Sequence, residues 1–138
     1  MPRPDFSGEW MLSKAASRLS PGADTVQSAR WVIDHREPVL KHQASFVFEG
    51  GPRDYEYELR SDGPVMPVDD DGTMGGWMHW DGDVLVVIFR QPLPTGQPGQ
   101  MTVAFRYELI DDGRRIRASE QVRGTAWDQD NVWIFERR

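Results

Sequence analysis

Alternation of apolar and polar residues with a period of two is the pattern that most restricts the fold of this chain. Its clearest example runs from 54 to 60, where Tyr55, Tyr57 and Leu59 alternate with charged residues. Because successive side chains of a β-strand point to opposite faces, this segment is typical of a strand with one packed face and one wet face. No amphipathic helix of more than two turns is evident. The pattern predicts strands at about 8–12, 30–36, 40–49, 54–60, 73–80, 83–91, 101–110, 114–124 and 131–137, and a weak one at 65–68.

The connections between these segments are typical of β-hairpins. Tight-turn sequences stand at Asp81-Gly82, Asp112-Gly113 and Glu49-Gly50-Gly51. Residues 91–100 are rich in Pro and Gly and predict a longer loop, while 13–23 has room for one helical turn at 14–19. We therefore predict one all-β domain over residues 1–138, an antiparallel up-and-down meander closed into a barrel of about eight to ten strands. Closure removes exposed strand edges, and such a barrel is large enough to enclose a small ligand.

Composition and charge exclude several classes of function. The formal net charge is −6 and the isoelectric point is about 5.0, which disfavours a nucleic-acid partner or an anionic membrane surface. The chain has no Cys, so disulfides and thiol chemistry are excluded. The longest apolar run, from Val84 to Phe89, is too short to insert across a membrane, and the first residues lack the apolar core of a signal peptide. We expect a cytoplasmic protein, although a trimmed secreted protein would look the same, and the sequence leaves a homo-oligomer open.

Three short motifs carry a family resemblance. The Gly-x-Trp of Phe6-Ser7-Gly8-Glu9-Trp10 resembles the first strand of the lipocalins and fatty-acid-binding proteins, which make up the calycin superfamily. Together with Trp80-Asp81-Gly82-Asp83 and Phe135-Glu136-Arg137, it is similar to the motif order of a group of small bacterial lipocalin-like proteins. The resemblance implies a barrel with a ligand-binding interior. It also implies that Trp10 packs beneath an Arg at the end of the barrel through a cation–π contact, with Arg137 as the first candidate and Arg123 as the second.

Polar residues in otherwise apolar rows are the candidate functional residues. His42 interrupts the apolar row of 40–48, and Glu120 interrupts that of 116–122. A buried carboxylate needs a partner, so Glu120 either anchors a ligand or forms a structural ion pair or hydrogen bond. His42 likewise either anchors a ligand or is a core histidine bonded to a neighbouring side chain. The predicted ligand-binding residues are His42, Tyr57, Tyr107, Glu120, Trp77 and Met78. The aromatic residues and Met78 have ordinary core packing as their alternative.

Three functions fit these residues. The leading hypothesis is a barrel that binds a small, partly apolar molecule, and the second is a filled barrel that binds a partner through an outer surface such as Val84, Val86 and Ile88. The third is a small enzyme with His42 or Glu120 as general base. No catalytic residue, metal site or cofactor is predicted, because nucleophile, phosphate-loop and dinucleotide motifs are missing and 69–72 matches a solvated acidic turn. A cavity of roughly 300 Å³ or more with His42 or Glu120 on its wall favours binding, and a solid core favours the interaction protein.

Overall fold

The chain forms one ten-stranded antiparallel sheet in which almost every strand pairs with its neighbours in sequence. The computed structural model describes residues 3–63, 66–67, 75–92, 100–124 and 127–138. The order across the sheet is β4-β3-β2-β1-β10-β9-β8-β7-β6-β5, so among the described strands β1 and β10 are the one neighbouring pair that is not consecutive in sequence. The strands are β1 (Gly8–Leu12), β2 (Val26–Arg36), β3 (Val39–Phe48), β4 (Gly51–Arg60), β5 (Met66–Pro67), β6 (Gly75–Asp81), β7 (Val84–Pro92), β8 (Gln100–Ile110), β9 (Arg115–Gly124) and β10 (Trp127–Arg137). This arrangement confirms the predicted up-and-down meander.

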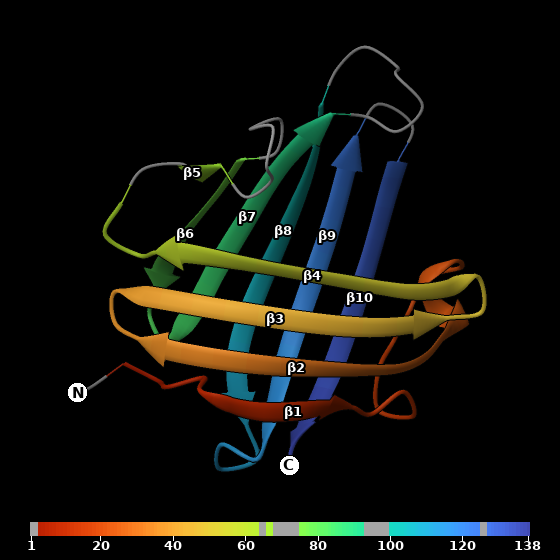
Figure 1. Cartoon of the computed structure of the whole chain (residues 1–138), viewed down its shortest axis with the longest axis horizontal. Coiled ribbons are helices and arrows are strands. Elements are labelled where there is room, and N and C mark those ends of the chain that lie inside the picture. Colours follow the sequence, from red (N-terminus) through yellow and green to blue (C-terminus); the bar gives the residue numbers. More distant parts are fainter. Residues whose placement is uncertain (1–2, 64–65, 68–74, 93–99, 125–126) are drawn as a thin grey trace.

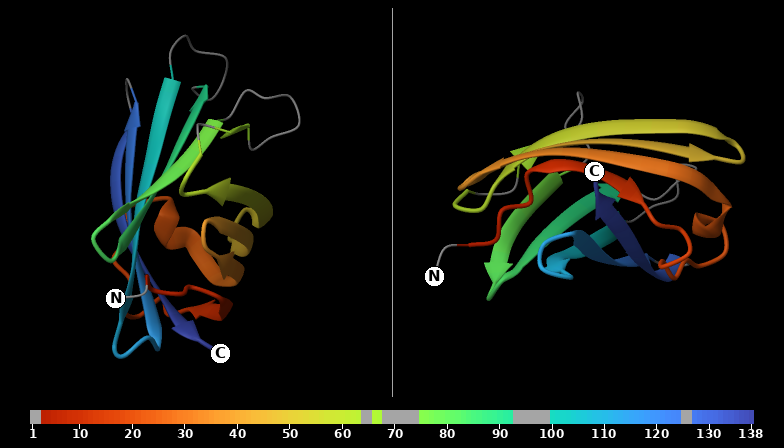
Figure 2. Two further views of the ribbon diagram at one scale, coloured as in Figure 1. Left: turned by 90° about the vertical axis from the view of Figure 1, so that its left-hand side faces the viewer. Right: turned by 90° about the horizontal axis from the view of Figure 1, so that it is seen from below.

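The sheet curls over on itself into a nearly closed barrel. Strands β1–β4 cross in front of β6–β10 at a steep angle (Figure 1), and the two further views show the same two layers from the side and from below (Figure 2). Strands β4 and β6 come close together, but they are not neighbours in the hydrogen-bonded order of the described residues. In the described residues the barrel is therefore open between β4 and the β5–β6 end of the sheet, while the pairing of β1 with β10 joins its two layers on the opposite side.

Two local predictions were wrong, and both have a backbone cause. No helix forms over 14–19: the chain makes one hydrogen-bonded turn, in which the Ser17 N–H donates to the Lys14 carbonyl at 3.1 Å, and Arg18 then exchanges backbone hydrogen bonds of 2.8 and 2.7 Å with Val132 of β10. The helical turn of the described chain is instead the 3₁₀ turn η1 (Ala23–Thr25). Strand β2 also begins earlier than predicted, since a register shift between Val26 and Ser28 interrupts the alternation there.

The alternating rows point as predicted. The inward residues Trp10, Trp31, Phe46, Tyr57, Leu85, Val87, Phe105 and Ile116 are all buried. The outward residues Lys41, Glu56, Glu58 and Arg117 are exposed. Tyr55 belongs to the inward row of Tyr57 and Leu59 but is 42% exposed, because its side chain lies at an open end of the barrel.

A tryptophan and an arginine join the first and last strands. Trp10 is fully buried, its Nε1–H donates to the Phe6 carbonyl at 3.0 Å, and the Arg137 guanidinium carbon lies 4.2 Å from the centre of its ring. Gly8 makes room for this contact, since its φ is +139° and a Cβ there would lie 2.7 Å from Arg137 Nη1. The predicted contact of Trp10 with Arg137 is confirmed. Arg123, the other candidate, instead forms an ion pair of 2.8 Å with Asp130.

Glu37 closes the other side of the barrel, in the turn between β2 and β3. Its carboxylate accepts hydrogen bonds from Trp80 Nε1 of β6 at 2.7 Å and from Ser61 Oγ at 2.8 Å. The backbone N–H of Phe6 donates to His35 Nδ1, so His35 Nε2–H donates to Glu37 at 3.1 Å. Burial opposes ionisation of Glu37, but these hydrogen bonds outweigh it and lower the pKa of the carboxyl. The contact therefore stabilises the approach of β6 to the first four strands when Glu37 is ionised.

Candidate ligand-binding site

The centre of the barrel is filled by aromatic side chains. Trp31 stacks on Phe135 with ring centres 3.8 Å apart and meets Tyr107 edge-on at 5.5 Å. Phe105 lies against Tyr107 at 5.5 Å. A pocket remains near the end of the barrel where β3 turns into β4. This turn lies on the right of Figure 1. A ligand-binding site inside this barrel therefore has to lie at its open end, which we call the mouth.

The mouth holds a pocket of about 240 Å³, which we call the mouth pocket. Its lining comes from six strands: Trp31, Phe46, Phe48, Arg53, Tyr55, Phe105, Glu120 and Trp133. A groove of about 500 Å³ adjoins it between η1 and the β3–β4 turn, and four residues line both: Phe48, Arg53, Glu120 and Trp133. The pocket is thus mainly aromatic, with one cation and one anion at its junction with the groove.

Strand register explains why space remains at this place. Ala44 of β3 pairs with Trp31 on one side and with Tyr55 on the other, so a methyl group lies between two large rings. Beyond it, Phe46 and Tyr55 stack with centres 5.8 Å apart and planes 19° apart. Tyr55 in turn stacks on Tyr57 at 6.3 Å. These parallel rings form a wall on which another flat apolar group is able to stack.

Glu120 is the polar residue that the sequence predicted and that the structure places in the mouth pocket. Its Oε1 accepts hydrogen bonds of 2.9 Å from Asn131 Nδ2 and from Trp133 Nε1. Asn131 is buried, and its Oδ1 accepts from the Ser20 N–H at 2.7 Å and from Ser20 Oγ at 2.9 Å. The other carboxylate oxygen, Oε2, has no hydrogen bond among the described residues. Glu120 is therefore held in position through one oxygen, with its other oxygen left for a donor.

The other predicted polar residues form a buried chain behind the mouth pocket. His42 Nδ1 lies 2.8 Å from Tyr57 Oη, which lies 3.3 Å from Tyr107 Oη. Burial lowers the pKa of His42 to about 3 and raises the pKa of both tyrosines above their ordinary value. All three groups are neutral near pH 7. A base with so low a pKa abstracts protons poorly at that pH, so the buried environment of His42 gives no support to its use as a general base.

Trp77 and Met78 lie on opposite faces of β6. Met78 points inward and is buried in the core, whereas Trp77 points outward with the Arg90 guanidinium 5.3 Å from its ring centre. His79 also points outward and is exposed. Neither Trp77 nor Met78 is in the lining of the mouth pocket. The predicted acidic turn at 69–72 and most of the predicted loop at 91–100 lie outside the described residues.

Sequence reasoning missed several residues of the mouth pocket. Arg53 extends the inward row of Tyr55 and Tyr57 by one step, so the alternation alone would have identified it. Trp133 and Asn131 also alternate inward along β10. Their hydrogen bonds to Glu120 connect β10 to β9, and no local sequence pattern predicts a hydrogen bond between two strands.

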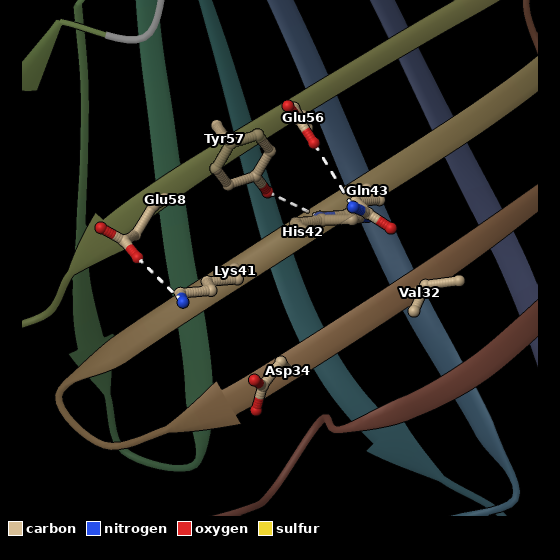
Figure 3. Close-up of a pocket in the computed structure, with 8 residues that line it drawn as sticks. All are labelled: Val32, Asp34, Lys41, His42, Gln43, Glu56, Tyr57 and Glu58. Carbon is tan, nitrogen blue, oxygen red and sulfur yellow. Dashed lines mark hydrogen bonds and ion pairs between the residues drawn. The ribbon is translucent and has the colours of Figure 1, made fainter.

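A second depression, on the outside of the barrel, is more open and more polar. It has a volume of about 480 Å³ and lies over β2–β4 (Figure 3). Its exposed pairs are Lys41 with Glu58, at 3.7 Å, and Gln43 with Glu56, at 3.4 Å. His42 and Tyr57 also border it, although their bonded side chains belong to the buried chain. Exposed ion pairs and hydrogen bonds of this kind contribute little to the stability of the fold. We assign no ligand to this surface.

The part of the chain that the structure describes holds neither a metal-binding cluster nor a helix that could span a membrane. Within those ranges, no group of three or more His, Asp or Glu side chains is placed to hold a metal ion. The single helical turn described there, η1, spans three residues, and no described helix is long and apolar enough to cross a membrane.

The barrel resembles solved structures along nearly its whole length. It matches a zebrafish ileal bile acid-binding protein in complex with cholic acid, with a TM-score of 0.59, 11% identity, and coverage of 96% of this chain and 98% of that chain. It also matches secretory abundant heat soluble protein 4 from Ramazzottius varieornatus, with a TM-score of 0.60, 14% identity, and coverage of 96% and 94%. No protein-family model and no curated protein sequence matches the chain. The likeness establishes the fold alone, a β-barrel of the kind formed by these two proteins.

Proposed function

We propose that this protein binds a small, partly apolar molecule in the mouth pocket, with Glu120 as its polar anchor. The observation that carries the proposal is an unfilled aromatic pocket bordered by a carboxylate with only one oxygen engaged. Binding sites are typically concave and mostly apolar, with a few placed polar groups. The neighbour that was solved in complex with cholic acid supports the use of this fold for binding.

The size of the mouth pocket sets the size of the molecule. At about 240 Å³ it falls short of the roughly 300 Å³ expected above for a binding cavity and of the 300–1,000 Å³ that is usual for drug-sized ligands, and the space exceeds that size only together with the adjoining groove of about 500 Å³. We therefore expect a compact molecule with one flat ring, which stacks against Phe46 and Tyr55. A larger molecule extends past Arg53 into the adjoining groove. A hydroxyl or amine on the ligand donates to Glu120 Oε2.

A fragment screen tests the proposal. Compounds with one or two rings are screened by thermal shift, because a ligand that binds only the native state raises its apparent stability. Hits are then mapped by NMR, and we expect shifts at Tyr55, Phe46 and the Trp133 indole N–H. Glu120→Gln removes a charged acceptor, and about 1.5–3 kcal/mol for such a bond corresponds to a loss of affinity of about 10- to 150-fold for hits that carry a donor.

Glu58→Gln is the matched control, since Glu58 is an exposed carboxylate on the outer face of β4. It should leave the affinity unchanged. Hits that shift only the outer depression, or that bind the Glu120 variant equally well, contradict the proposal.

A further inference from the structure

The mouth pocket is lined by six aromatic rings and by two charged side chains of opposite sign. The charged residues are Glu120 and Arg53, and both also line the adjoining groove. Among the described residues neither of them takes part in an ion pair, whereas Arg123, three residues after Glu120 on β9, is paired with Asp130. The charge that a ligand meets in the pocket therefore decides which charge the ligand itself carries.

Glu120 is the charge that is both held in place and open to a ligand. Asn131 and Trp133 hold its Oε1 at 2.9 Å, and both are neutral donors, so they supply no counter-charge. The side chain is half-buried and lines both the pocket and the groove. Among the described residues, the buried side-chain atoms without a partner are Trp31 Nε1 and His42 Nε2, so the unbonded Oε2 of Glu120 keeps accessible surface. A donor in the mouth pocket is therefore able to reach Oε2.

The aromatic rings of the pocket favour a cation as well. Phe46 stacks with Phe48 and with Tyr55, each at 5.8 Å, and meets Trp133 edge-on at 5.6 Å with planes 73° apart. Rings in two nearly perpendicular orientations thus line the pocket. The face of an aromatic ring carries negative potential, which attracts an ammonium group and repels a carboxylate. The rings and Glu120 therefore act on a ligand in the same sense.

Arg53 acts in the opposite sense, but from a more exposed position. Its side chain is exposed, and no hydrogen bond of the described residues fixes it. It pairs with Phe46 across β3 and β4, one inward step beyond Tyr55. Water and salt screen an exposed charge more strongly than a half-buried one. The net charge of −6 also attracts small cations to the protein rather than anions.

We infer that the molecule bound in the mouth pocket is a protonated aromatic amine, whose ammonium group donates a hydrogen bond to Glu120 Oε2 and pairs with its charge. This inference rests on the proposed function and deepens it, because it narrows the donor on the ligand to a cation. The ring of the ligand stacks on Phe46 and Tyr55, as proposed above. Its ammonium group lies beside Trp133 at the junction of the pocket and the groove, where Glu120 borders both.

Three probes of similar size and different charge test the inference in the wild-type protein. Benzylamine is a cation near pH 7, benzyl alcohol is a neutral donor, and benzoate is an anion. Affinities come from NMR titration of the indole N–H resonance of Trp133, which is hydrogen-bonded to Glu120. We expect benzylamine to bind about five- to thirtyfold more tightly than benzyl alcohol, the range for a partly desolvated cation–π contact. Benzoate should bind most weakly, and added salt should weaken the binding of benzylamine but not that of benzyl alcohol.

Glu120→Gln is the matching variant, because it keeps the shape of the side chain and removes the charge. It should bind benzylamine and benzyl alcohol about equally. Glu58→Gln removes an exposed carboxylate from the outer face of β4 and should keep the wild-type ratio. Arg53→Gln should raise the affinity for benzylamine about two- to fivefold, the range for one exposed charge, and leave that for benzyl alcohol unchanged. If Glu120→Gln does not fold, the wild-type ratio, its salt dependence and Arg53→Gln still decide the question.

Equal binding of benzylamine and benzyl alcohol at the mouth, or tighter binding of benzoate, overturns the inference and leaves the proposed function standing. Tighter binding of benzylamine that persists in Glu120→Gln, or that leaves the Trp133 resonance unmoved, also overturns the inference, because the cation then binds elsewhere on the acidic protein. If none of the three probes binds, the fragment screen decides. Hits at the mouth that carry no ammonium group overturn the inference, and the absence of any hit at the mouth overturns the proposed function as well.

Discussion

Replacement of Trp10 by Ala is expected to destabilise the barrel by about 3–5 kcal/mol, the range for deletion of a large core aromatic side chain. Trp10 has no exposed surface. A large aromatic side chain buries about 150–250 Å², which at about 25 cal/mol per Å² corresponds to about 4–6 kcal/mol. That figure is an upper bound, because the unfolded chain hides part of this area. Small domains have about 5–15 kcal/mol of stability, so the variant should be marginal.

The assay is urea unfolding of Trp10→Ala followed by far-ultraviolet circular dichroism, which does not depend on the deleted fluorophore. Trp77→Ala is the control, because Trp77 is half-buried on the outer face and should cost about 1–2 kcal/mol. A double-mutant cycle with Arg137→Gln should give a coupling of about 0.5–1 kcal/mol, the range for an exposed cation–π contact. A loss below about 1 kcal/mol for Trp10→Ala would show that Trp10 does not hold β1 against β10, and would refute the reasoning.

Two further predictions concern other contacts of the fold. Because hydrogen bonds lower the pKa of Glu37 in the folded protein, its stabilising contribution is complete above the ordinary pKa of 4.5 and is lost as pH falls through the lowered value. Glu37→Gln should therefore lower the urea midpoint at pH 6 more than at pH 3, and an equal effect at both would contradict the assigned contact. Gly8→Ala should destabilise the protein, because Gly8 has a positive φ and a Cβ would displace Arg137. Thermal unfolding measures this effect, with Gly50→Ala as the control because a Cβ at Gly50 meets nothing within 4 Å.

The side-chain alternation predicted the strands and their faces because most strands of this barrel have one wet side. Lys41 and Glu58, for example, stand opposite each other outside, while the residues next to them in sequence point inward. The alternation failed at the start of β2, where the register shift at Val26 puts two adjacent residues out of step. The helical turn predicted at 14–19 stops after the hydrogen-bonded turn at 14–17, because the bridge from Arg18 to Val132 is a tertiary contact that overrides local preference.

The candidate site was predictable only in part. A charged residue in an apolar row identified Glu120, and the structure places it in the mouth pocket. The same reasoning selected His42, whose partners fill the core. Which of the two borders the mouth pocket depends on how rings from six strands pack around Ala44. That packing is set by pairs far apart in the sequence, such as Ser20 with Asn131, and alternation within one strand carries no information about it.

The position of β1 has a consequence for the order in which the chain folds. Every other neighbouring pair of strands is consecutive in sequence, but β1 pairs with β10, at almost the opposite end of the chain. Loop-closure entropy makes such a contact slow to form, and proteins rich in long-range contacts fold slowly. We therefore expect the pairing of β1 with β10 to be a late event. Until it occurs, β10 presents an unpaired edge, and self-association of partly folded chains is greatest during that interval.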